Sequence, residues 1–576
     1  MPSRYDTQPT VAISAFSSDC AVGWPAIADC LRRCRGGRLC IECYPGVLVE
    51  PIEQAIANAL RPSRIFRASE CLQSPPEIEA MLAPYLGEDP VFGRMNGLEL
   101  ADFFDRKKFD AARKSIAESA GGVLVIGTGA ALLAPEADVL IYADLARWEI
   151  QTRQRNNEIP NLGAENHLER ASLKYKRAFF VDWRAADRLK QRLLPRADFV
   201  LDTNRRDDPK LISGDLFRSA LAAVVRRPFR VVPFFDPGPW GGEWMRRVIG
   251  LPEDPPNFAW CFDCVPEENS LLLGLGEVRL EVPAIDLVFT HPRELLGEAV
   301  YARFGREFPI RFDMLDTMDG GNLSLQVHPL TEYIQDKFGM HYTQDESYYL
   351  LDAGKDAVVY LGLQENIQPV GMLRALERAQ QGGAPFPAGQ FVNRWPVKQH
   401  DHVLIPAGTI HCSGKNCMVL EISATPYIFT FKLWDWGRLG LDGLPRPIHL
   451  EHGRNNIQWN STTPWVRQNL LHRTERLASH EGWSEERTGL HEREFIETRR
   501  HWFRQKVEHH THGGVNVLNL VAGDAVVVES PDHAFEPLVI HYAETFIVPA
   551  AVGRYTIQPA RPGRCATIKA FVRTNP

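Results

Sequence analysis

Four residues in the middle of the chain carry side chains that could bind a divalent metal ion. Gln326 and His328 lie two residues apart in GGNLSLQVHP, where apolar and polar residues alternate as in a β-strand. Successive side chains of a strand point to opposite faces, so these two share one face. Glu346 stands just ahead of the strand-like SYYLLDA, and His411 follows a Pro-Ala-Gly turn in VLIPAGTIHCSG. Two imidazoles, one carboxylate and one amide oxygen suit Zn²⁺, and Mn²⁺, Fe²⁺ or Co²⁺ are acceptable.

Spacing alone leaves a second interpretation open. Gln-x-His on a strand is a weak pattern, and each of the 18 histidines could instead be structural or exposed to solvent. The elements that would position the four residues are short strands separated by glycine and proline turns: SYYLLDA, DAVVYLGL, HVLIPAG, CMVLEIS and YIFTFKLWDW, with a helical insertion at PVGMLRALERAQQGG. Such a series predicts a sandwich or barrel. A second block, ending in CATIKAFV, has the same pattern of short strands and turns and predicts a related barrel.

The N-terminal part of the chain has a different pattern. Strand-like segments such as TVAISAF, GRLCIECYPG and GGVLVIGTGA alternate with helix-like ones such as VEPIEQAIANAL and RAADRLKQRLLPRA. This alternation predicts a parallel sheet covered on both faces. We therefore expect a multidomain protein, with an α/β parallel-sheet domain at 1–225, an all-β domain with helical insertions at 226–445, and a connector with a second all-β domain at 446–576.

Composition limits the classes of partner and the compartment. The 576 residues carry a formal net charge of -7, which gives no reason to expect nucleic acid or an anionic membrane as partner. No apolar run reaches the roughly 20 residues of a membrane span, and no secretion signal is evident at the N-terminus. The eleven cysteines are an odd number, which favours reduced thiols and a cytoplasmic location. The Cys40/Cys43 and Cys261/Cys264 pairs lie too far apart in sequence to favour a shared zinc site.

An ordered series of motifs carries a family resemblance. NLSLQVHP, DESYYLLDAG, VVYLGLQE, VLIPAGTIHCSG, VLEISATPYIFTFKLWDWGR and PRPIHLEH follow one another as in type I phosphomannose isomerases, and GRYTI resembles a motif of their second barrel. The likeness covers roughly residues 228–576 and implies a double-cupin (jelly-roll) fold. It also implies that Gln326, His328, Glu346 and His411 hold one Zn²⁺ per chain. The activity implied is the interconversion of mannose 6-phosphate and fructose 6-phosphate through an enediol.

That reaction moves a proton between two carbon atoms of a sugar phosphate, the one small-molecule partner we expect. A divalent ion can stabilise the charge that develops on the oxygens, and a nearby base must carry the proton. Glu421 matches a family glutamate near the metal and is expected to support catalysis, unless it is a structural carboxylate paired with a cation. Lys432 and Arg438 are expected to act in catalysis and to bind the substrate phosphate. Ser324 and Lys415 are weaker substrate-binding candidates, and each cation could equally be a solvated surface charge.

Two departures from the family pattern keep other functions open. Many members have a lysine where this chain has Gln344, and the loop after Glu421 lacks the usual arginine unless Lys432 replaces it. Fewer cations would weaken phosphate binding, so a non-catalytic, metal-bound sensor of sugar phosphates is the alternative. The histidines of EHHTHGG, His509, His510 and His512, could form a second metal site, although a polar strand or turn explains them as well.

The N-terminal region resembles a degenerate P-loop kinase of the nucleoside or uridine kinase type. TVAISAF runs into SSDCAVGWPAIADCL, which lacks the lysine and Ser/Thr of a functional phosphate-binding loop. Arg147, Arg153 and Arg155 resemble the arginines of a lid helix, although a solvated basic face is the simpler interpretation. Gly127 and Gly129 form an isolated G-x-G, which close packing explains equally well. We expect a scaffold, nucleotide-sensing or oligomerisation role. A bifunctional enzyme with a residual sugar kinase is the alternative, and the oligomeric state is not indicated.

Overall fold

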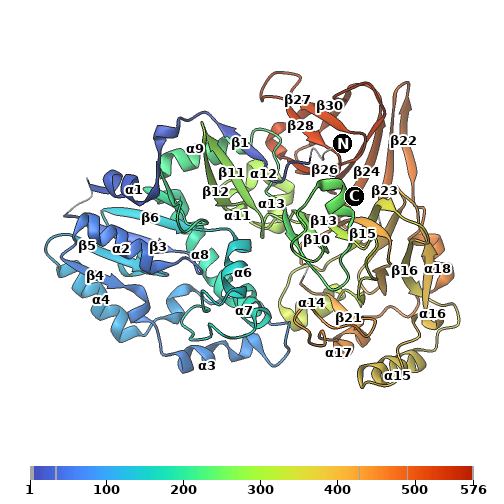
Figure 1. The fold of residues 1–576 in the computed structure, drawn as a ribbon, viewed down its shortest axis with the longest axis horizontal. Helices are drawn as coiled ribbons and strands as arrows, with labels where there is room; N and C mark the ends of the chain where they lie inside the picture. Colours follow the sequence, from blue (N-terminus) through green and yellow to red (C-terminus); the bar gives the residue numbers. More distant parts are fainter. Residues whose placement is uncertain (1–4, 33–35, 427, 490, 574–576) are drawn as a thin grey trace. The chain divides into compact units, whose positions relative to one another are not determined.

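The computed structural model describes residues 5–32, 36–426, 428–489 and 491–573, which divide into two compact units (Figure 1). The β-rich unit comprises Met1–Pro9, Val225–Val265 and Pro292–Pro576, and the α/β unit comprises Thr10–Val224 and Pro266–His291. The predicted boundary at residue 225 therefore needs correction, because Pro266–His291 belongs to the α/β unit. Apart from Pro266–His291, the regions predicted as separate domains, 226–445 and 446–576, lie together in one unit.

A three-stranded sheet explains the corrected boundary. Strand β1 (Thr10–Ile13) pairs in parallel with β11 (Ser270–Leu275), which pairs with β12 (Val278–Pro283). The prediction that TVAISAF is the first strand of the main parallel sheet is therefore wrong. Its partner lies some 260 residues further along the chain, and local periodicity carries no information about so distant a pairing.

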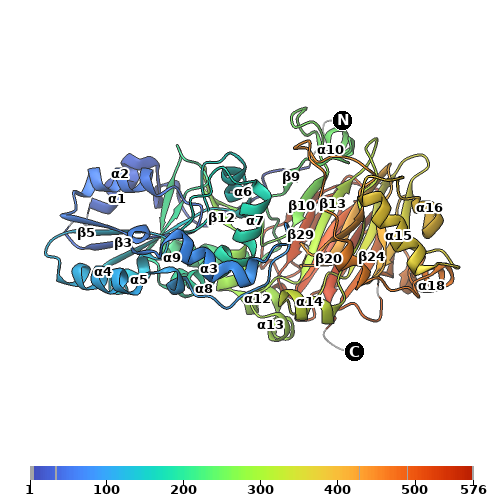
Figure 2. The ribbon, with the colours of Figure 1, turned by 90° about the horizontal axis from the view of Figure 1, so that it is seen from below.

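The main sheet of the α/β unit has seven strands in the order β2-β8-β7-β6-β3-β5-β4. The five strands from β7 to β4 run parallel, whereas β8 is antiparallel to both of its neighbours, β7 and β2. Within this unit, Figure 2 shows α1 and α2 on one face of the sheet and α4, α5 and α8 on the other. Helices cover both faces of the sheet, as predicted, but the sheet is mixed rather than wholly parallel because β8 runs the other way. The strands β3 and β5 are almost wholly buried.

The strands of this sheet are β2 (Cys20–Val22), β3 (Arg38–Cys43), β4 (Arg64–Arg67), β5 (Val123–Gly127), β6 (Val139–Asp144), β7 (Phe199–Asp202) and β8 (Lys210–Ser213). The helices of the unit are α1 (Gly23–Leu31), α2 (Val49–Leu60), α3 (Pro75–Leu86), α4 (Arg106–Glu118), α5 (Ala130–Leu133), α6 (Arg147–Arg155), α7 (Ala171–Arg177), α8 (Trp183–Leu193), α9 (Gly214–Val224) and α11 (Ile285–Thr290). The sequence alone predicts helix α2, because the apolar residues Ile52, Ile56 and Leu60 recur every four positions. In the structure they form its buried face.

The β-rich unit contains two pairs of antiparallel sheets. In the first pair, a six-stranded sheet has the order β18-β15-β20-β13-β10-β9 and a five-stranded sheet the order β17-β16-β19-β14-β21. The strands are β9 (Phe234–Asp236), β10 (Trp260–Cys264), β13 (Ile310–Asp316), β14 (Leu325–Val327), β15 (Glu346–Ala353), β16 (Val358–Leu363), β17 (Val392–Pro396), β18 (His402–Ile405), β19 (His411–Ser413), β20 (Cys417–Ala424) and β21 (Phe431–Trp434).

The second pair combines the six-stranded sheet β22-β23-β24-β31-β26-β29 with the four-stranded sheet β25-β30-β27-β28. Its strands are β22 (Glu475–His480), β23 (Trp483–Gly489), β24 (Ile496–Phe503), β25 (Val507–His510), β26 (Asn516–Ala522), β27 (Ala525–Glu529), β28 (Leu538–His541), β29 (Thr545–Val548), β30 (Arg554–Pro559) and β31 (Cys565–Val572). The segment predicted as a connector, roughly 446–500, thus contributes β22, β23 and the start of β24 to this sheet. Apolar side chains from both sheets, including Phe503, Val526 and Phe546, form the core between them.

Short helices punctuate the β-rich unit: α10 (Trp244–Ile249), α12 (Pro292–Leu296), α13 (Glu298–Phe304), α14 (Thr331–Phe338), α15 (Pro369–Gln380), α16 (Ala388–Phe391), α17 (Leu450–Arg454) and α18 (Thr463–Asn469). The predicted helical insertion is α15, which begins at a proline, a residue suited to the first turn of a helix. Among the described residues, no helix is long and apolar enough to cross a membrane.

Candidate metal centre

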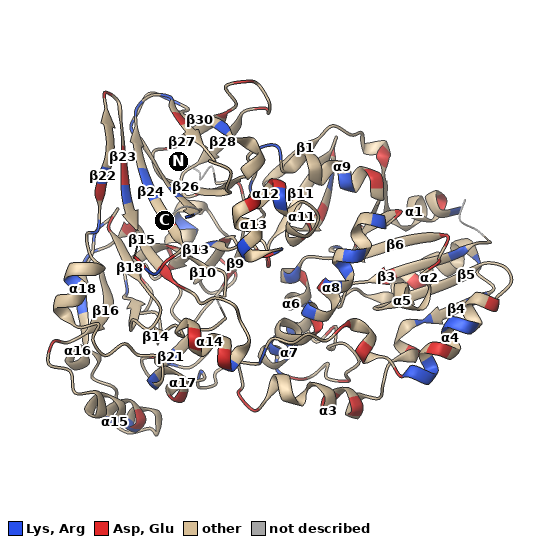
Figure 3. Ribbon diagram, turned by 180° about the vertical axis from the view of Figure 1, so that it is seen from behind, with Lys and Arg blue, Asp and Glu red and all other residues tan. Residues whose placement is uncertain are grey.

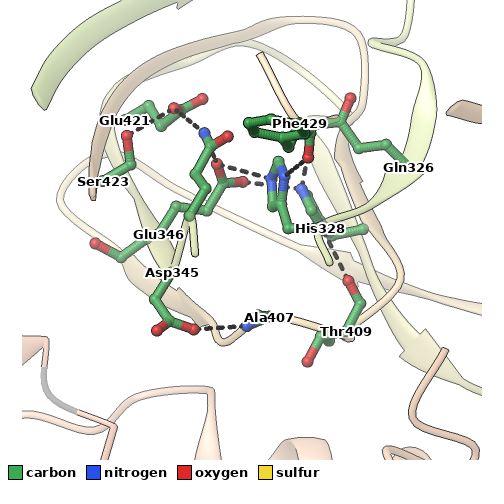
Figure 4. Close-up of polar contacts among 12 residues, drawn as sticks. Gln326, His328, Asp345, Glu346, Ala407, Thr409, Glu421, Ser423 and Phe429 are labelled. Carbon is green, nitrogen blue, oxygen red and sulfur yellow. Dashed lines mark hydrogen bonds and ion pairs between the residues drawn. The ribbon is translucent and has the colours of Figure 1, made fainter. Parts of the chain in front are cut away.

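The four predicted metal ligands converge between the two sheets of the first pair. Gln326 on β14 lies opposite His411 on the neighbouring strand β19, and His328 follows two residues after Gln326. Glu346 is the first residue of β15 in the other sheet. All four side chains are buried, with exposed fractions from 0% for His411 to 6% for Gln326. Figure 4 shows the side chains around Glu346 and His328 turned toward one another.

The geometry of this group fits a metal ion. Nε2 of His411 lies 2.8 Å from Oε1 of Glu346, and Nε2 of His328 lies 3.1 Å from Oε2 of the same carboxylate. The candidate ligand atoms of these three residues all lie within 4.8 Å of one another. Yet Nε2 of His328 and Oε1 of Glu346 are buried and have no partner in hydrogen-bonding geometry among the described residues. Buried polar atoms normally have partners, so a cation between these atoms would satisfy them.

Backbone carbonyls hold both imidazoles in the orientation that a metal requires. Nδ1 of His411 donates to the carbonyl of Thr409 at 2.9 Å, and Nδ1 of His328 to the carbonyl of Phe429 at 3.2 Å. A proton on Nδ1 leaves the lone pair of Nε2 free to coordinate. Burial alone would raise the pKa of Glu346, but the two imidazoles hold that pKa well below its usual range. The carboxylate is therefore ionised and able to act as a ligand.

The Pro-Ala-Gly turn before His411 is tied to the rest of the site. The amide of Gly408 donates to the carbonyl of His328 at 3.0 Å, and the amide of Ala407 donates to Asp345 at 2.7 Å. Gly408 has a φ of +85°, and a Cβ there would lie 2.8 Å from the carbonyl oxygen of Asn456. Only glycine adopts this conformation and tolerates so close an approach, so the turn motif sets the position of His411.

Glu421, the predicted catalytic carboxylate, lies in the same interior on β20. It accepts from Arg311 at 2.6 Å and from Gln344 at 3.2 Å. The amide of Gln344 also donates to Glu346 at 3.0 Å and so links the two carboxylates. Burial, followed by the negative charge of Glu346, raises the pKa of Glu421 to about 7. Glu421 is therefore paired with a cation, as its alternative interpretation stated, and is also poised to exchange a proton near neutral pH.

The substrate-binding candidates separate into two groups. Ser324 and Arg438 meet at Asp435, whose Oδ1 accepts from Ser324 at 2.9 Å and from Arg438 at 2.6 Å. Lys432 lies opposite Gln326 in the β14–β21 pairing. Burial, and next the charge of Arg446, lowers the pKa of Lys432 to about 8. By contrast, Lys415 is exposed, and its backbone amide donates to Oδ1 of Asn322 at 2.9 Å.

Sequence reasoning missed Arg446. Its guanidinium donates to Asp435 at 2.8 Å and to Ser324 at 3.1 Å, so it joins the group around Ser324 and Arg438. The signal was present in the motif PRPIHLEH, where Arg446 stands between two prolines. Ser324, Lys432, Arg438 and Arg446 together supply the hydroxyl and cations that a phosphate group needs.

The other sequence candidates do not form metal sites. Among the described residues, only His328, Glu346 and His411 form a group of three or more metal-ligand residue types. His509 is buried, whereas His510 and His512 are exposed, and their rings pair with each other at 4.7 Å. The ten described cysteines are free, and Cys34 lies outside the described residues.

The expected lid arginines of the α/β unit are mostly buried rather than solvated. Arg147 is 2% exposed and pairs with Asp187 at 2.6 Å. Arg153 is 3% exposed and pairs with Glu149 at 2.8 Å. The interpretation as a solvated basic face is therefore wrong for both residues, while Arg155 is exposed.

The isolated G-x-G of this unit has a structural explanation. Gly127 and Gly129 have φ values of +120° and +90°, and a Cβ on Gly129 would lie 2.4 Å from the ring of Phe104. The buried carboxylate of Glu42 accepts from the amides of Gly129 at 2.7 Å and Ala131 at 2.8 Å. Close packing, one of the two open interpretations, therefore accounts for these glycines.

Comparisons with known proteins separate the same two regions. Residues 23–226 match a family model described as a domain of unknown function (DUF8485). The mannose-6-phosphate isomerase of Streptococcus mutans is 26% identical over 233 residues, covering 39% of this chain and 68% of the relative. Mannose-6-phosphate isomerase ManA of Bacillus subtilis is 28% identical over 234 residues, covering 40% of this chain and 67% of the relative.

The solved structures similar to this chain carry related names. The mannose 6-phosphate isomerase of Bacillus subtilis has a TM-score of 0.49 at 18% identity, covering 60% of this chain and 99% of that one. A zinc-bound mannose 6-phosphate isomerase has a TM-score of 0.45 at 15% identity, with the same coverage. The chain is thus similar, over about 40% of its length, to curated proteins named mannose-6-phosphate isomerases.

Proposed function

We propose that this protein is a metal-dependent aldose–ketose isomerase that interconverts mannose 6-phosphate and fructose 6-phosphate. The observation that carries the proposal is the buried group of His328, Glu346 and His411, with ligand atoms within 4.8 Å of one another. The sequence similarity to mannose-6-phosphate isomerases adds the reaction and the substrate. Two imidazoles and a carboxylate favour zinc, and the similar solved structures include a zinc-bound one.

Gln326 would complete the ligand set. Its Nε2 lies 3.2 Å from Nε2 of His411. A half-turn of the amide brings Oε1 to this position and supplies the fourth ligand. A bound divalent ion would supply Lewis-acid stabilisation of the negative charge on the two sugar oxygens during enolisation. The double-cupin fold expected from the resemblance is part of the proposal, and the two pairs of packed antiparallel sheets support it.

The residues of the chain supply the proton transfer. A base with a pKa near the working pH transfers protons most effectively, and Glu421 has a pKa of about 7. We assign it the transfer between C1 and C2 of the sugar. Arg311 and Gln344 orient its carboxylate through hydrogen bonds of 2.6 and 3.2 Å. Gln344 takes the place of the lysine found in many family members, so a neutral donor serves where they have a cation.

The phosphate group would lie against the cations of β21 and the loop that follows it. Arg438 and Arg446 are both held by Asp435, at 2.6 and 2.8 Å, which fixes the direction of their guanidinium groups. Lys432 faces the interior beside Gln326 and would act closer to the reacting end of the sugar. Ser324 can donate to a phosphate oxygen. Lys415 remains a candidate from the sequence alone, because its side chain is exposed and its backbone amide contacts Asn322 rather than Asp435.

A metal-bound sensor of sugar phosphates is the second candidate, and the neutral Gln344 favours it. An isomerase assay on the purified full-length protein, combined with metal analysis, separates the two. Mannose 6-phosphate would be supplied and fructose 6-phosphate measured, with and without a chelator. Chelator-sensitive turnover with one zinc per chain supports the isomerase. Bound metal and bound mannose 6-phosphate without turnover support the sensor, and a protein that binds no divalent metal contradicts both.

For the α/β unit we propose a degenerate kinase-like scaffold without phosphoryl transfer. In doubly wound sheets, ligands bind at the carboxyl ends of the strands. Here Lys190 pairs at that end of β6 with Asp144 at 2.7 Å and with Asp286 at 2.5 Å, and all three side chains are buried. Buried ion pairs thus occupy the position a nucleotide would need. ATP consumption in the presence of hexoses would contradict this proposal and favour the bifunctional alternative. The cytoplasmic location and the absence of nucleic-acid and membrane partners stay predictions.

A further inference from the structure

A second polar cavity lies in the C-terminal pair of sheets, away from the metal centre. Its volume is about 640 Å³, and its lining comes entirely from residues 485–573. None of the metal-centre residues contributes to it. Cavities of this size typically hold small-molecule ligands. We refer to it as the C-terminal cavity; its polar lining includes Glu485, Arg487, Arg499, His501, His509 and Lys569.

The cavity lies where the inner face of the sheet changes from apolar to charged residues along its strands. On β24, alternate residues point to the same side, so Arg499 and His501 share a face with Phe503. On β31, Lys569 shares a face with Cys565 in the same way. Phe503 and Cys565 belong to the apolar core, whereas Arg499, His501 and Lys569 line the cavity. The interior is therefore apolar at one end and charged at the other.

Three cations form a row across neighbouring strands in the charged end. Arg487 on β23 pairs in register with Arg499 on β24, which pairs with Lys569 on β31. Figure 3 shows positive and negative residues along β23 and β24. Like charges directly opposite each other destabilise a sheet. Arg487 pairs with Glu475 at 2.9 Å and Arg499 with Glu497 at 2.6 Å, so carboxylates compensate these two cations.

Lys569 is the least compensated member of the row. It is 7% exposed, and among the described residues no carboxylate forms an ion pair with it. Burial lowers its pKa to about 8. Arg499, by contrast, pairs with Glu497 at 2.6 Å and with Glu485 at 3.1 Å. Nζ of Lys569 lies 5.6 Å from the ring centroid of Phe571, but a buried ammonium without an ion pair costs free energy unless an anion accompanies it.

Two histidines supply further unused hydrogen-bonding groups. His509 is 6% exposed, and its Nε2 has no partner among the described residues. Its ring packs against His501, with centroids 4.6 Å apart, and Nε2 of His501 lies 3.1 Å from Glu485. Burial lowers the pKa of both imidazoles, so both are neutral at neutral pH. Because no three metal-ligand residues of the described chain converge here, the cavity suits an organic ligand better than a metal ion.

We propose that the C-terminal cavity is a second ligand site, which binds a small hydroxylated anion of sugar-phosphate size. The anionic group lies against Lys569 and the neighbouring Arg499, where charge-assisted hydrogen bonds are strongest. Carboxylates and amides of the lining, such as Glu485 and Asn516, accept hydrogen bonds from hydroxyl groups. The proposal does not depend on whether the metal centre is an isomerase, because the two sites share no residue.

Calorimetric titration of the full-length protein tests the proposal. The probes are mannose 6-phosphate, inorganic phosphate, gluconate and mannose. Each is titrated into the parent protein and into Lys569→Met, Lys569→Arg, Lys506→Met and Arg438→Met. Lys506 is the matched control, because it lies in the loop between β24 and β25, is 52% exposed and pairs with Glu529 at 2.7 Å. Arg438→Met alters the first site alone. Thermal unfolding of each variant shows that it is folded.

The expected result is one binding event that Lys569→Met weakens at least about tenfold, as the loss of a charge-assisted bond implies. Lys569→Arg restores part of it, and Lys506→Met and Arg438→Met leave it unchanged. Binding of mannose 6-phosphate or inorganic phosphate assigns a phosphate group to the ligand, whereas binding of gluconate assigns a carboxylate. Three results overturn the proposal: no binding event beyond the one that Arg438→Met removes, equal affinity in a folded Lys569→Met protein, or equally tight binding of uncharged mannose.

Discussion

Gln326 and His411 face each other on neighbouring antiparallel strands, with their side-chain nitrogens 3.2 Å apart. Lys432 lies on the other side of Gln326 in the same sheet. The three side chains therefore form a row across β19, β14 and β21 that connects the metal ligands to the cations proposed to bind phosphate. Glu346 and Glu421 approach this row from the other sheet. The site is thus formed by two sheets whose register brings the candidate metal ligands, Glu421 and Lys432 together.

Replacement of His411 by alanine is expected to remove both the bound metal and the activity. His411 supplies one of two imidazoles, and loss of a direct ligand should exceed the roughly 10–100-fold effect of losing an outer-shell partner. Metal content by mass spectrometry and isomerase turnover would be measured together. His341→Ala is the control, because His341 is exposed. Full metal stoichiometry in a folded His411→Ala protein would refute the ligand set.

Gln344→Lys tests the departure from the family pattern. A cation at this position would lie between Glu346 and Glu421, which Gln344 now contacts at 3.0 and 3.2 Å. It should lower the pKa of Glu421 and shift the acidic limb of the pH profile to lower pH. Gln344→Leu, which removes both hydrogen bonds, should reduce kcat by roughly tenfold or more. Turnover that appears only in Gln344→Lys would favour the sensor over the isomerase.

The pH dependence of turnover should report Glu421. Its pKa of about 7 is raised by burial and next by Glu346, whereas Arg311 lowers it. A base acts when deprotonated, so kcat/KM should rise with pH along an acidic limb and then level off. The charge of a divalent ion held by Glu346 would place that limb below about pH 7. Arg311→Met removes the lowering influence and should move this limb to higher pH. An acidic limb that keeps its position in a folded Glu421→Gln protein would exclude Glu421 as its source.

Arg446→Met should weaken substrate binding more than it slows the chemical step. Arg446 donates to Asp435 and Ser324 at the proposed phosphate position, far along the sugar from the reacting carbons. Loss of one charge-assisted contact corresponds to roughly 10–100-fold in KM. Steady-state kinetics would be compared with Arg454→Met, whose guanidinium is 48% exposed and pairs with Glu451. An unchanged KM would remove Arg446 from the substrate site.

Lys190→Met should destabilise the α/β unit. The substitution leaves Asp144 and Asp286 buried without their cation, and removal of one partner of a buried ion pair costs about 3–5 kcal/mol. The free energy of unfolding would be measured by chemical denaturation. Lys114→Met is the control, because Lys114 is 76% exposed in an i,i+4 pair with Glu118. Equal stability of the two variants would mean that the buried triad is not a structural element.

The sequence by itself predicted most of the strands of the β-rich unit and the candidate metal ligands. Period-two alternation identified the strands of the β-rich unit and placed Gln326 and His328 on one face, and a four-residue spacing of apolar residues identified α2. These signals are local, since each depends on residues within one strand or helix. Glu346 and His411 are candidates from their places beside a strand and after a turn, and the family resemblance favours them as ligands together with Gln326 and His328. The structure brings His328, Glu346 and His411 together.

The tertiary structure decided what depends on pairing between distant segments. Neither the parallel pairing of β1 with β11 nor the membership of Pro266–His291 in the α/β unit follows from any local pattern. The same holds for the burial of Arg147, for the place of Arg446 beside Ser324, and for the row of Arg487, Arg499 and Lys569. The sequence does not show whether a charged residue such as Arg147 contacts water or a carboxylate 40 residues away, as it does with Asp187. Only packing determines which of the two it meets.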